Sequence, residues 1–596
     1  MRTAGEIAFR VRQEAANIRL WARPPAARFE PGWSPRFPAP DARGVSAALL
    51  DTDFARQVIE LASSIRAHRF SLLGLEVDTG PEIRWRRDYQ RGIETGLDYF
   101  RFIPYLDGGR AGDHKLIWEL NRHQHLVILA QAYLFTGDRS NLIEICTQLE
   151  SWFAQNPFSR GINWASALEV AFRSLSWIWI YHFVGQQLPA GFRTRWLREL
   201  YLHACFIENN LSVYFSPYNH LVGEALALHA LGLFFGPLPK AVRWEILGAR
   251  IMREQMDRQV HTDGSNVEQS TYYHVYVLDM FLLHAILKKP DRAYLDKLER
   301  MAGYLDAVLG HSRSLAFIGD DDGGRLFHPY GARAQFGRAT VATAATLLDG
   351  AAWSWQARDL HSQAAWWLGF GSTPQPTQPS PTSRLFPDAG LAIMVCGRNQ
   401  IIVNAGSFGP SGGGHSHAGA LSIVARSGDE EILIDPGTYT YTGEPAWRDW
   451  FRGTEAHNTI RIDQLNQASL AGPFRWTNQP QVNVLSWHTN AARDMLEAEC
   501  RYRGFTHRRR VEFQKPDVLI VIDDIAGPAG EHDIEQLWHL GSPDARGRMT
   551  LPDDAECVES WRSTTFGEKH SAPLVRVRRR SNLPLHLETR IQLNPR

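Results

Sequence analysis

The sequence is poor in cysteine, and the few cysteines it has are scattered. Five occur in 596 residues and no two form a C-x-x-C pair: Cys146, Cys205, Cys396, Cys500 and Cys557. This spacing excludes a cysteine-ligated zinc cluster and a dense disulfide framework. We expect the five side chains to be buried thiols.

The sequence also lacks a long apolar run and an excess of charge of either sign. No run of about eighteen apolar residues occurs, so we expect no membrane span. Residues 1–25 show no apolar core with a small-residue cleavage site, so no signal peptide is visible. The 64 basic residues balance the 64 acidic ones, which argues against nucleic acid as a partner. The basic stretch 507–510 is more simply explained as the solvated start of a strand.

The first part of the chain carries a helical pattern. At 596 residues the chain is too long for one ordinary core. Apolar residues recur at three- and four-residue steps from about residue 85 to 369, which predicts successive helices. The clearest are 118–130, 164–183, 219–235 and 240–259. Such helices suit a bundle, a solenoid or a closed ring alike.

A proline-rich stretch at 371–385 marks a change of pattern, because it cannot continue a helix and is typical of an interdomain linker. Beyond it, short runs rich in β-branched residues are divided by turn dipeptides, which predicts an antiparallel β-sandwich. We therefore expect an N-terminal segment of uncertain fold (1–84), a helical domain (85–370), the linker, and a β-sandwich domain (386–596).

Residues 403–462 concentrate the side chains that bind metals and move protons. A glycine-rich loop presents His415 and His417, Asp435 ends an apolar run, and His457 opens a further strand. In an extended His-x-His segment both side chains point the same way. Two histidines and a carboxylate are typical of a metal site. One histidine of the pair could therefore bind metal while the other meets a substrate.

A helix start in the helical part could join this loop. Asn219 lies at a plausible N-cap, and His220 and Glu224, four residues apart, share one helix face. Each also has a simpler explanation, because asparagine often only caps a helix and histidine is often a satisfied core residue.

A second helix start follows after one intervening helix. The Ser265-x-x-Glu268 pattern is a capping-box signature ahead of Tyr273. In up-and-down packing, helices two apart run in the same direction, so both starts would open at the same end of the domain. This would place Asn219, His220 and Tyr273 on one rim, although a buried tyrosine is more often simple packing.

In order and spacing, these motifs resemble the heparinase II/III-like polysaccharide lyases over most of the chain. The resemblance is carried by Asn219-His220, Glu268-x-Ser-x-x-Tyr273-His274, the linker, His415-x-His417, Asp435 and His457-Asn458-Thr459. It implies an incomplete (α/α) toroid packed on an antiparallel β-sandwich, with the active site in the cleft between them. It also implies β-elimination across the 4-position of a uronic acid in a polysaccharide, which leaves an unsaturated sugar.

The chemistry of this reaction explains the residue types. The C5 proton of a uronate becomes acidic only when donors stabilise the charge that builds on the carboxylate, a task suited to Asn219 and His415. The resemblance gives Tyr273 the role of general acid, and for one C5 configuration also that of base, with His220 as the alternative base.

The resemblance further implies a zinc ion on His417, Asp435 and His457, with a structural role that aims His415. Candidates for substrate contacts are Glu224, Tyr439, Arg452, Trp118 and Arg122. Ion pairs between packed helices explain the Trp118–Arg122 region equally well.

Two other functions stay open. A glycoside hydrolase would use Asp320, Asp321 or Asp322 with a second carboxylate, although these residues are most simply a polar turn. A non-catalytic carbohydrate-binding or polymer-assembly protein could keep the same fold. The polysaccharide (heparin-like, alginate or bacterial exopolysaccharide) is not identified, and balanced charge argues mildly against dense sulfation. The resemblance implies a periplasmic protein, whereas the absence of a visible signal peptide would suit a cytoplasmic one. The oligomeric state is not predicted.

Overall fold

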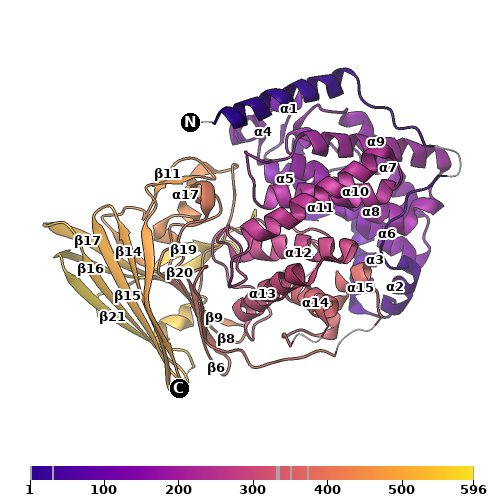
Figure 1. Ribbon diagram of the computed structural model, residues 1–596. Helices are drawn as coiled ribbons and strands as arrows, with labels where there is room; N and C mark the ends of the chain where they lie inside the picture. The colour runs from indigo at the N-terminus through magenta and orange to yellow at the C-terminus, as the bar shows by residue number, and fades with distance from the viewer. Residues whose placement is uncertain (1–2, 30–32, 331–335, 350–351, 372–374, 595–596) are drawn as a thin grey trace.

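The computed structural model describes residues 3–29, 33–330, 336–349, 352–371 and 375–594, so residues 372–374 of the expected linker lie outside the described part. A helical half is followed by a half of antiparallel β-sheets (Figure 1). No helix in the described ranges is both long and apolar enough to cross a membrane.

The helical half is an incomplete (α/α) toroid of two nested rings. Its inner helices are buried on nearly every side: α6 (Gln124–Thr136), α8 (Ala167–Val184), α10 (Asn219–Phe235), α12 (Thr271–Lys288) and α14 (Phe336–Leu348). The outer helices each keep a polar face: α7 (Ser140–Gln155), α9 (Ala190–Asn209), α11 (Pro239–Gln259) and α13 (Arg292–Leu309). An all-apolar helix must be enclosed by others, and an amphipathic one can cover it. The alternation of the two kinds along the chain therefore produces the double ring.

The first 84 residues, whose fold the sequence leaves open, extend the same helical core. They form α1 (Ala4–Ala22), α2 (Ala42–Leu49), α3 (Asp53–Arg66) and the ribbon of β1 (Arg69–Leu72) with β2 (Leu75–Asp78). The core is continuous from Ala42 to Trp367, so a boundary at residue 85 does not divide it. Helix α1 lies on α9 at the edge of the half (Figure 1).

Short elements complete this half. They are β3 (Arg87–Asp88), β4 (Ile93–Glu94), α4 (Gly108–Ala111), α5 (His114–Asn121), α15 (Ala364–Leu368) and the 3-10 helices Phe100–Phe102, Ile162–Trp164, Gly185–Gln187 and Ala357–Leu360. The helix predicted over 118–130 is broken between α5 and α6, because His123 adopts a left-handed backbone. Its buried Nδ1 accepts a hydrogen bond from Trp177 Nε1 at 2.8 Å.

The β half contains three larger antiparallel sheets. The first consists of β5 (Arg384–Phe386), β6 (Leu391–Cys396), β7 (Asn399–Asn404), β8 (Ser422–Ser427) and β9 (Glu430–Leu433). The second orders β10 (Ile460–Ile462), β17 (Glu531–His539), β20 (His570–Asn582) and β19 (Glu556–Arg562). The third orders β13 (Gln481–Thr489), β14 (Arg493–Tyr502), β15 (Phe505–Gln514), β16 (Val518–Ala526), β21 (Leu585–Gln592) and β18 (Met549–Thr550). Short connections include α16 (Pro410–Gly413), α17 (Pro445–Phe451), β11 (Ser469–Leu470) and β12 (Trp476–Thr477).

The first sheet joins the two halves. Burial does not alternate along its strands β6 and β7, because both faces of the sheet are covered. One face carries Met394 into the sandwich core, and the other carries Ile393 against Tyr304 of α13. The sandwich is thus fixed to the toroid through its inner sheet.

Two smaller expectations are resolved by the sheets. The five cysteines, all within the described residues, are free thiols, but only Cys205 and Cys500 are buried. Cys146 and Cys396 are half-buried, and Cys557 is exposed on β19. The basic stretch 507–510 lies within β15, where Arg508 and Arg510 face solvent while His507 and Arg509 bind the buried Asp523.

Candidate active site

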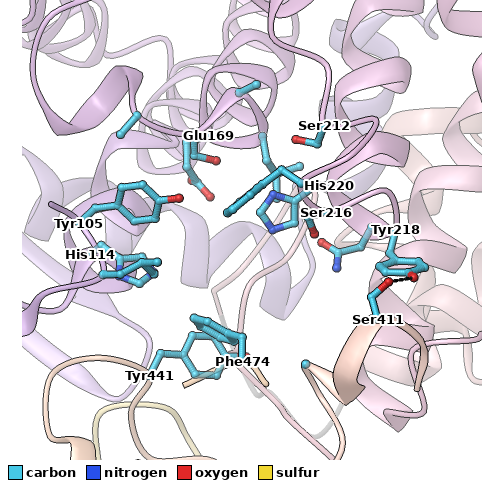
Figure 2. Close-up of a pocket in the computed structure, with 18 of the residues that line it drawn as sticks. Tyr105, His114, Glu169, Ser212, Ser216, Tyr218, His220, Ser411, Tyr441 and Phe474 are labelled. Carbon is cyan, nitrogen blue, oxygen red and sulfur yellow. Dashed lines mark hydrogen bonds between the residues drawn. The ribbon is translucent and has the colours of Figure 1, made fainter. Parts of the chain in front are cut away.

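A cleft of about 730 Å³ lies between the two halves. The helical half contributes the starts of α5, α8, α10 and α12, and the β half contributes the glycine-rich loop 409–415 and residues 471–475. Figure 2 shows His220 in this cleft, across from Tyr441 and Phe474. All four residues predicted to be catalytic, Asn219, His220, Tyr273 and His415, line it.

The helix starts give the cleft its electrostatic character. The first turns of α5, α8, α10 and α12 open here with His114, Glu169, Asn219 and Tyr273. The N-terminus of a helix carries partial positive charge and unpaired N–H groups, so it favours an anion. Several converging helix starts suit a ligand that carries a carboxylate.

Tyr273 is positioned by the N-cap of its helix and by three partners of its side chain. Its backbone N–H donates to the N-cap Ser270 at 3.1 Å. Its hydroxyl donates to Asp322 at 3.2 Å and lies 3.0 Å from the Tyr441 hydroxyl, while its ring stacks on His415 with centroids 3.7 Å apart. Burial and the neighbouring Asp322 carboxylate raise the pKa of Tyr273 well above its ordinary value. The phenol therefore stays protonated at neutral pH.

His415 is aimed by a buried carboxylate. Its Nδ1 lies 3.1 Å from Asp320 Oδ2, and Asp320 is also bound by both terminal nitrogens of Arg448. Burial opposes ionisation of Asp320, but Arg448 and the two histidines hold its pKa well below the usual range. An ionised carboxylate only accepts hydrogen bonds, so Nδ1 of His415 carries a proton. Its Nε2 is directed toward the Glu268 side of the cleft, 3.7 Å from that carboxylate.

Asn219 is not the N-cap that its sequence position suggests. The cap of α10 is Tyr218, and Asn219 is the first helical residue. Its amide nitrogen donates to Glu268 at 2.7 Å, and its backbone N–H donates to the same carboxylate at 3.2 Å. Glu268 in turn is not part of a capping box, because the N-cap of α12 is Ser270 and the helix begins at Thr271. The carboxylate instead holds the amide of Asn219 in place.

His220 is a neutral imidazole at the cleft wall. Burial lowers its pKa to about 4, against a raising effect of Glu169. A neutral imidazole can accept a proton, whereas the protonated Tyr273 can donate one. The cleft therefore holds a base and an acid in opposite protonation states.

Behind His415 lies a buried group of two imidazoles and a carboxylate. Ligand atoms of His417, Asp435 and His457 lie within 4.8 Å of one another. His417 Nδ1 is 3.2 Å from His457 Nε2, which is 3.5 Å from Asp435 Oδ2. The sequence predicts these three as metal ligands, and the structure brings them together.

The other nitrogen of each imidazole is already committed. His417 Nε2 lies 3.0 Å from Asp320 Oδ1, and His457 Nδ1 lies 2.7 Å from the Gly453 carbonyl. Both partners are acceptors, so the remaining nitrogens, His417 Nδ1 and His457 Nε2, present lone pairs to the common point. Metal-binding histidines are usually oriented in this way. Two nitrogens and one carboxylate oxygen fit zinc with a fourth position left over.

Three of the predicted substrate contacts have other partners: Glu224, Tyr439 and Arg452 are not among the described residues lining the cleft. Glu224 accepts from the backbone N–H and the hydroxyl of Ser212, both at 2.6 Å. Tyr439 donates to Glu444 at 2.7 Å. Arg452 donates to the carbonyl of Gly472 at 2.8 Å and thereby supports the 471–475 wall.

Trp118 and Arg122 do line the cleft, but both are engaged. The Trp118 indole donates to the Ile162 carbonyl at 3.0 Å. Arg122 forms a bidentate pair with Glu169, at 2.7 and 2.8 Å, which makes the ion-pair explanation of this region the better one.

Sequence reasoning did not give several residues of the site their observed roles. Asp320 and Asp322, expected in a polar turn, are both buried: Asp322 lines the cleft and pairs with Lys115 at 3.2 Å, while Asp320 binds His415 from outside the cleft lining. Arg448 carried no motif at all. A triple aspartate followed by two glycines was the available signal for the first two, and nothing in the sequence pairs them with residues more than 100 positions away.

The fold and the site define a two-domain protein in which an (α/α) toroid and an antiparallel β-sandwich share one cleft. Two family models match this arrangement: "Heparinase II/III N-terminus" over residues 52–302 and "Heparinase II/III-like, C-terminal" over residues 378–589. Together they cover well over half of the chain. It therefore belongs to the heparinase II/III-like family.

Individual relatives are distant. The chain is 22% identical over 482 residues to a heparin-sulfate lyase of Bacteroides stercoris, a match that covers 74% of this chain and 66% of that protein, just under two thirds. A crystal structure of heparinase III is 16% identical with a TM-score of 0.68, and the match covers 98% of this chain and 90% of that one. A chondroitin AC lyase of Streptomyces coelicolor, in complex with chondroitin sulphate, is 14% identical with a TM-score of 0.52, over 98% and 82%. The structural similarities establish the fold.

Proposed function

We propose that this protein is a polysaccharide lyase that cleaves a 4-linked uronic-acid polymer by β-elimination. The observation that carries the proposal is the protonated Tyr273 phenol stacked on His415, in one cleft with Asn219 and the neutral His220. The names of the relatives, heparin-sulfate lyase and chondroitin AC lyase, support the reaction class.

Each side chain has a role in this reaction. The uronate carboxylate accepts from the Asn219 amide and from His415, which stabilises the negative charge that builds as the C5–H bond breaks. His220 accepts the C5 proton, and Tyr273 gives its proton to the departing O4 oxygen. This division follows from the pKa values, since Tyr273 is held protonated and His220 unprotonated. The C4–O4 bond breaks as the C4=C5 double bond forms, giving an unsaturated end.

We further propose a structural zinc ion on His417, Asp435 and His457. The ion would fix the loop that carries His415. His417 reaches the same Asp320 carboxylate as His415, so its orientation bears directly on the substrate-facing ring.

The charges of the cleft favour a polymer with few sulfates. Lys115 and Arg122, the two buried cations among the described residues that line it, are neutralised by Asp322, Glu119 and Glu169. A densely sulfated chain would be better matched by unpaired basic groups.

The experiment that tests the function is absorbance near 232 nm while the protein is incubated with heparan sulfate, chondroitin sulfate and alginate. We expect one of them to give a rise that Tyr273→Phe abolishes. Tyr304→Phe, a buried tyrosine on α13 outside the cleft, is the matched control and should keep the activity. New reducing ends without absorbance would instead establish a hydrolase.

A further inference from the structure

Helix α1 precedes the part of the chain that the family models match, which begins at residue 52. It nevertheless forms a wall of the cleft, to which it contributes Phe9, Arg10 and Gln13. The cleft therefore extends beyond the residues that the family models match.

The attachment of α1 combines polar contacts with the packing of Leu20 against the helical core. Within the described part of the helix, Asn17 is the one fully buried side chain, and it exchanges two amide hydrogen bonds with Asn210, at 2.8 and 2.9 Å. Gln13 donates to the Asn209 carbonyl at 3.1 Å, and Glu14 accepts from Tyr99 at 2.8 Å. Such contacts specify a position but bury little apolar surface. The small contribution of α1 to the hydrophobic core does not by itself explain its position beside the cleft.

The position of α1 completes an aromatic surface at the end of the cleft. The ring of Phe9 lies 5.2 Å from that of Tyr214, on the loop between α9 and α10. Tyr214 is 44% exposed and its neighbour Phe215 is 62% exposed, yet both line the cleft. The loop is held in place, because the backbone N–H and the hydroxyl of Ser212 both donate to the buried Glu224.

These groups match the chemistry of a sugar ring. Aromatic side chains offer flat apolar faces, and amide and guanidinium groups beside them can bond hydroxyl or carboxylate oxygens. The same cleft continues from these residues to Tyr273 and His415. A polymer that binds with one sugar residue at Tyr273 and His415 would therefore also contact Phe9, Tyr214 and Phe215.

We propose that α1 and the loop 211–216 form a distal subsite that binds a further sugar residue of the polysaccharide, with Phe9 and Phe215 as the stacking groups. This inference rests on the proposed function for the identity of the ligand. The subsite acts on long substrates, since a short oligosaccharide seated at Tyr273 does not reach it. It thereby sets a preference for chain length.

The test compares Phe9→Ala and Phe215→Ala with the unchanged protein on the cleaved polymer and on its shortest cleavable oligosaccharide. We expect KM for the polymer to rise about 10-fold, as loss of one stacking contact would give, and to rise much less for the oligosaccharide. Val11→Ala, on the exposed outer side of α1, is the matched control and should change neither value. Phe215 is largely exposed, so its truncation spares the fold even if that of Phe9 does not.

A binding measurement tests the subsite independently of the proposed lyase activity. Fluorescently labelled polymer, or labelled heparan sulfate if no polymer is cleaved, is titrated in the Tyr273→Phe background. Weaker binding on adding Phe215→Ala supports the subsite, whether or not the unchanged protein is a lyase. Polymer affinity and KM that are both insensitive to Phe9→Ala and Phe215→Ala would overturn it, even in an active lyase.

Discussion

A single carboxylate connects His415, which faces the cleft, to His417 of the proposed metal site. Asp320 is fully buried, and its two oxygens are shared among Arg448, His415 and His417. Its charge is stable only because Arg448 opposes the cost of burial. The orientation of both imidazoles thus depends on one ion pair.

Asp320→Asn should therefore damage stability and activity together. An amide cannot neutralise Arg448, and an unpaired buried charge costs about 3–5 kcal/mol. We expect the midpoint of denaturant unfolding to fall. The proposed lyase activity should be lost, because an amide offers one acceptor oxygen to the three donors Arg448, His415 and His417. Asp554→Asn, which removes an exposed partner of Arg579, is the control and should leave the midpoint almost unchanged. Superimposable curves for Asp320→Asn and the unchanged protein would refute this account of the site.

Glu224 gives a prediction about pH. Burial raises its pKa from 4.5 to about 8, so the folded protein holds this proton at neutral pH while the unfolded chain releases it. Between those values the native state binds more protons, so stability falls as pH rises, by about 1.4 kcal/mol per pH unit at most. Glu224→Gln cannot titrate. Its melting temperature relative to that of the unchanged protein should increase from pH 5 to pH 8, and a constant difference would show that Glu224 is not protonated in the fold.

At the scale of elements, the sequence predicted the bounds of single helices but not the contacts between residues far apart in the chain. The period of apolar residues placed α10 at 219–235, as observed, because the helix is bounded by its own sequence. The capping assignments for Asn219 and Ser265-x-x-Glu268 were wrong. Glu268 and Asn219 bind each other across 49 residues, and that contact exists only once two inner helices are side by side.

The proposed metal site also depends on several elements: Asp435 follows β9, His457 precedes β10, and His417 follows the glycine-rich loop. We expect purified protein to contain about one zinc per chain, and His457→Ala to lose it, because a three-ligand site cannot spare an imidazole. The variant and chelator-treated protein should both melt at a lower temperature. His570→Ala, an exposed histidine on β20, should keep its zinc. Equal zinc content in His457→Ala would exclude this group as the site.

At the scale of the whole molecule, the cleft depends on how the two halves are seated. The sequence pattern predicted successive helices and a sandwich, and the resemblance implied a toroid packed on that sandwich. Neither identified the residues that join the two halves, because those residues are far apart in the chain. Arg426 on β8 donates to the carbonyls of Val308 and Leu309, at 2.7 and 2.9 Å, and to that of Ser314 at 2.8 Å. A cation from the sandwich thus caps the C-terminus of α13, where the helix dipole is negative.

Arg426→Met should loosen this junction while leaving each half folded. Burial lowers the pKa of Arg426 to about 10, so the group is charged at neutral pH and its loss strands carbonyls that cost on the order of 1–3 kcal/mol each. In calorimetry we expect one transition to broaden or divide in two, since the halves have separate cores. KM should rise with it, because Tyr273 belongs to one half and His415 to the other. Arg398→Met, an exposed position in the turn between β6 and β7, is the control and should change neither. A single sharp transition at the original temperature would mean that the apolar contacts of α13 with the inner sheet hold the halves without Arg426.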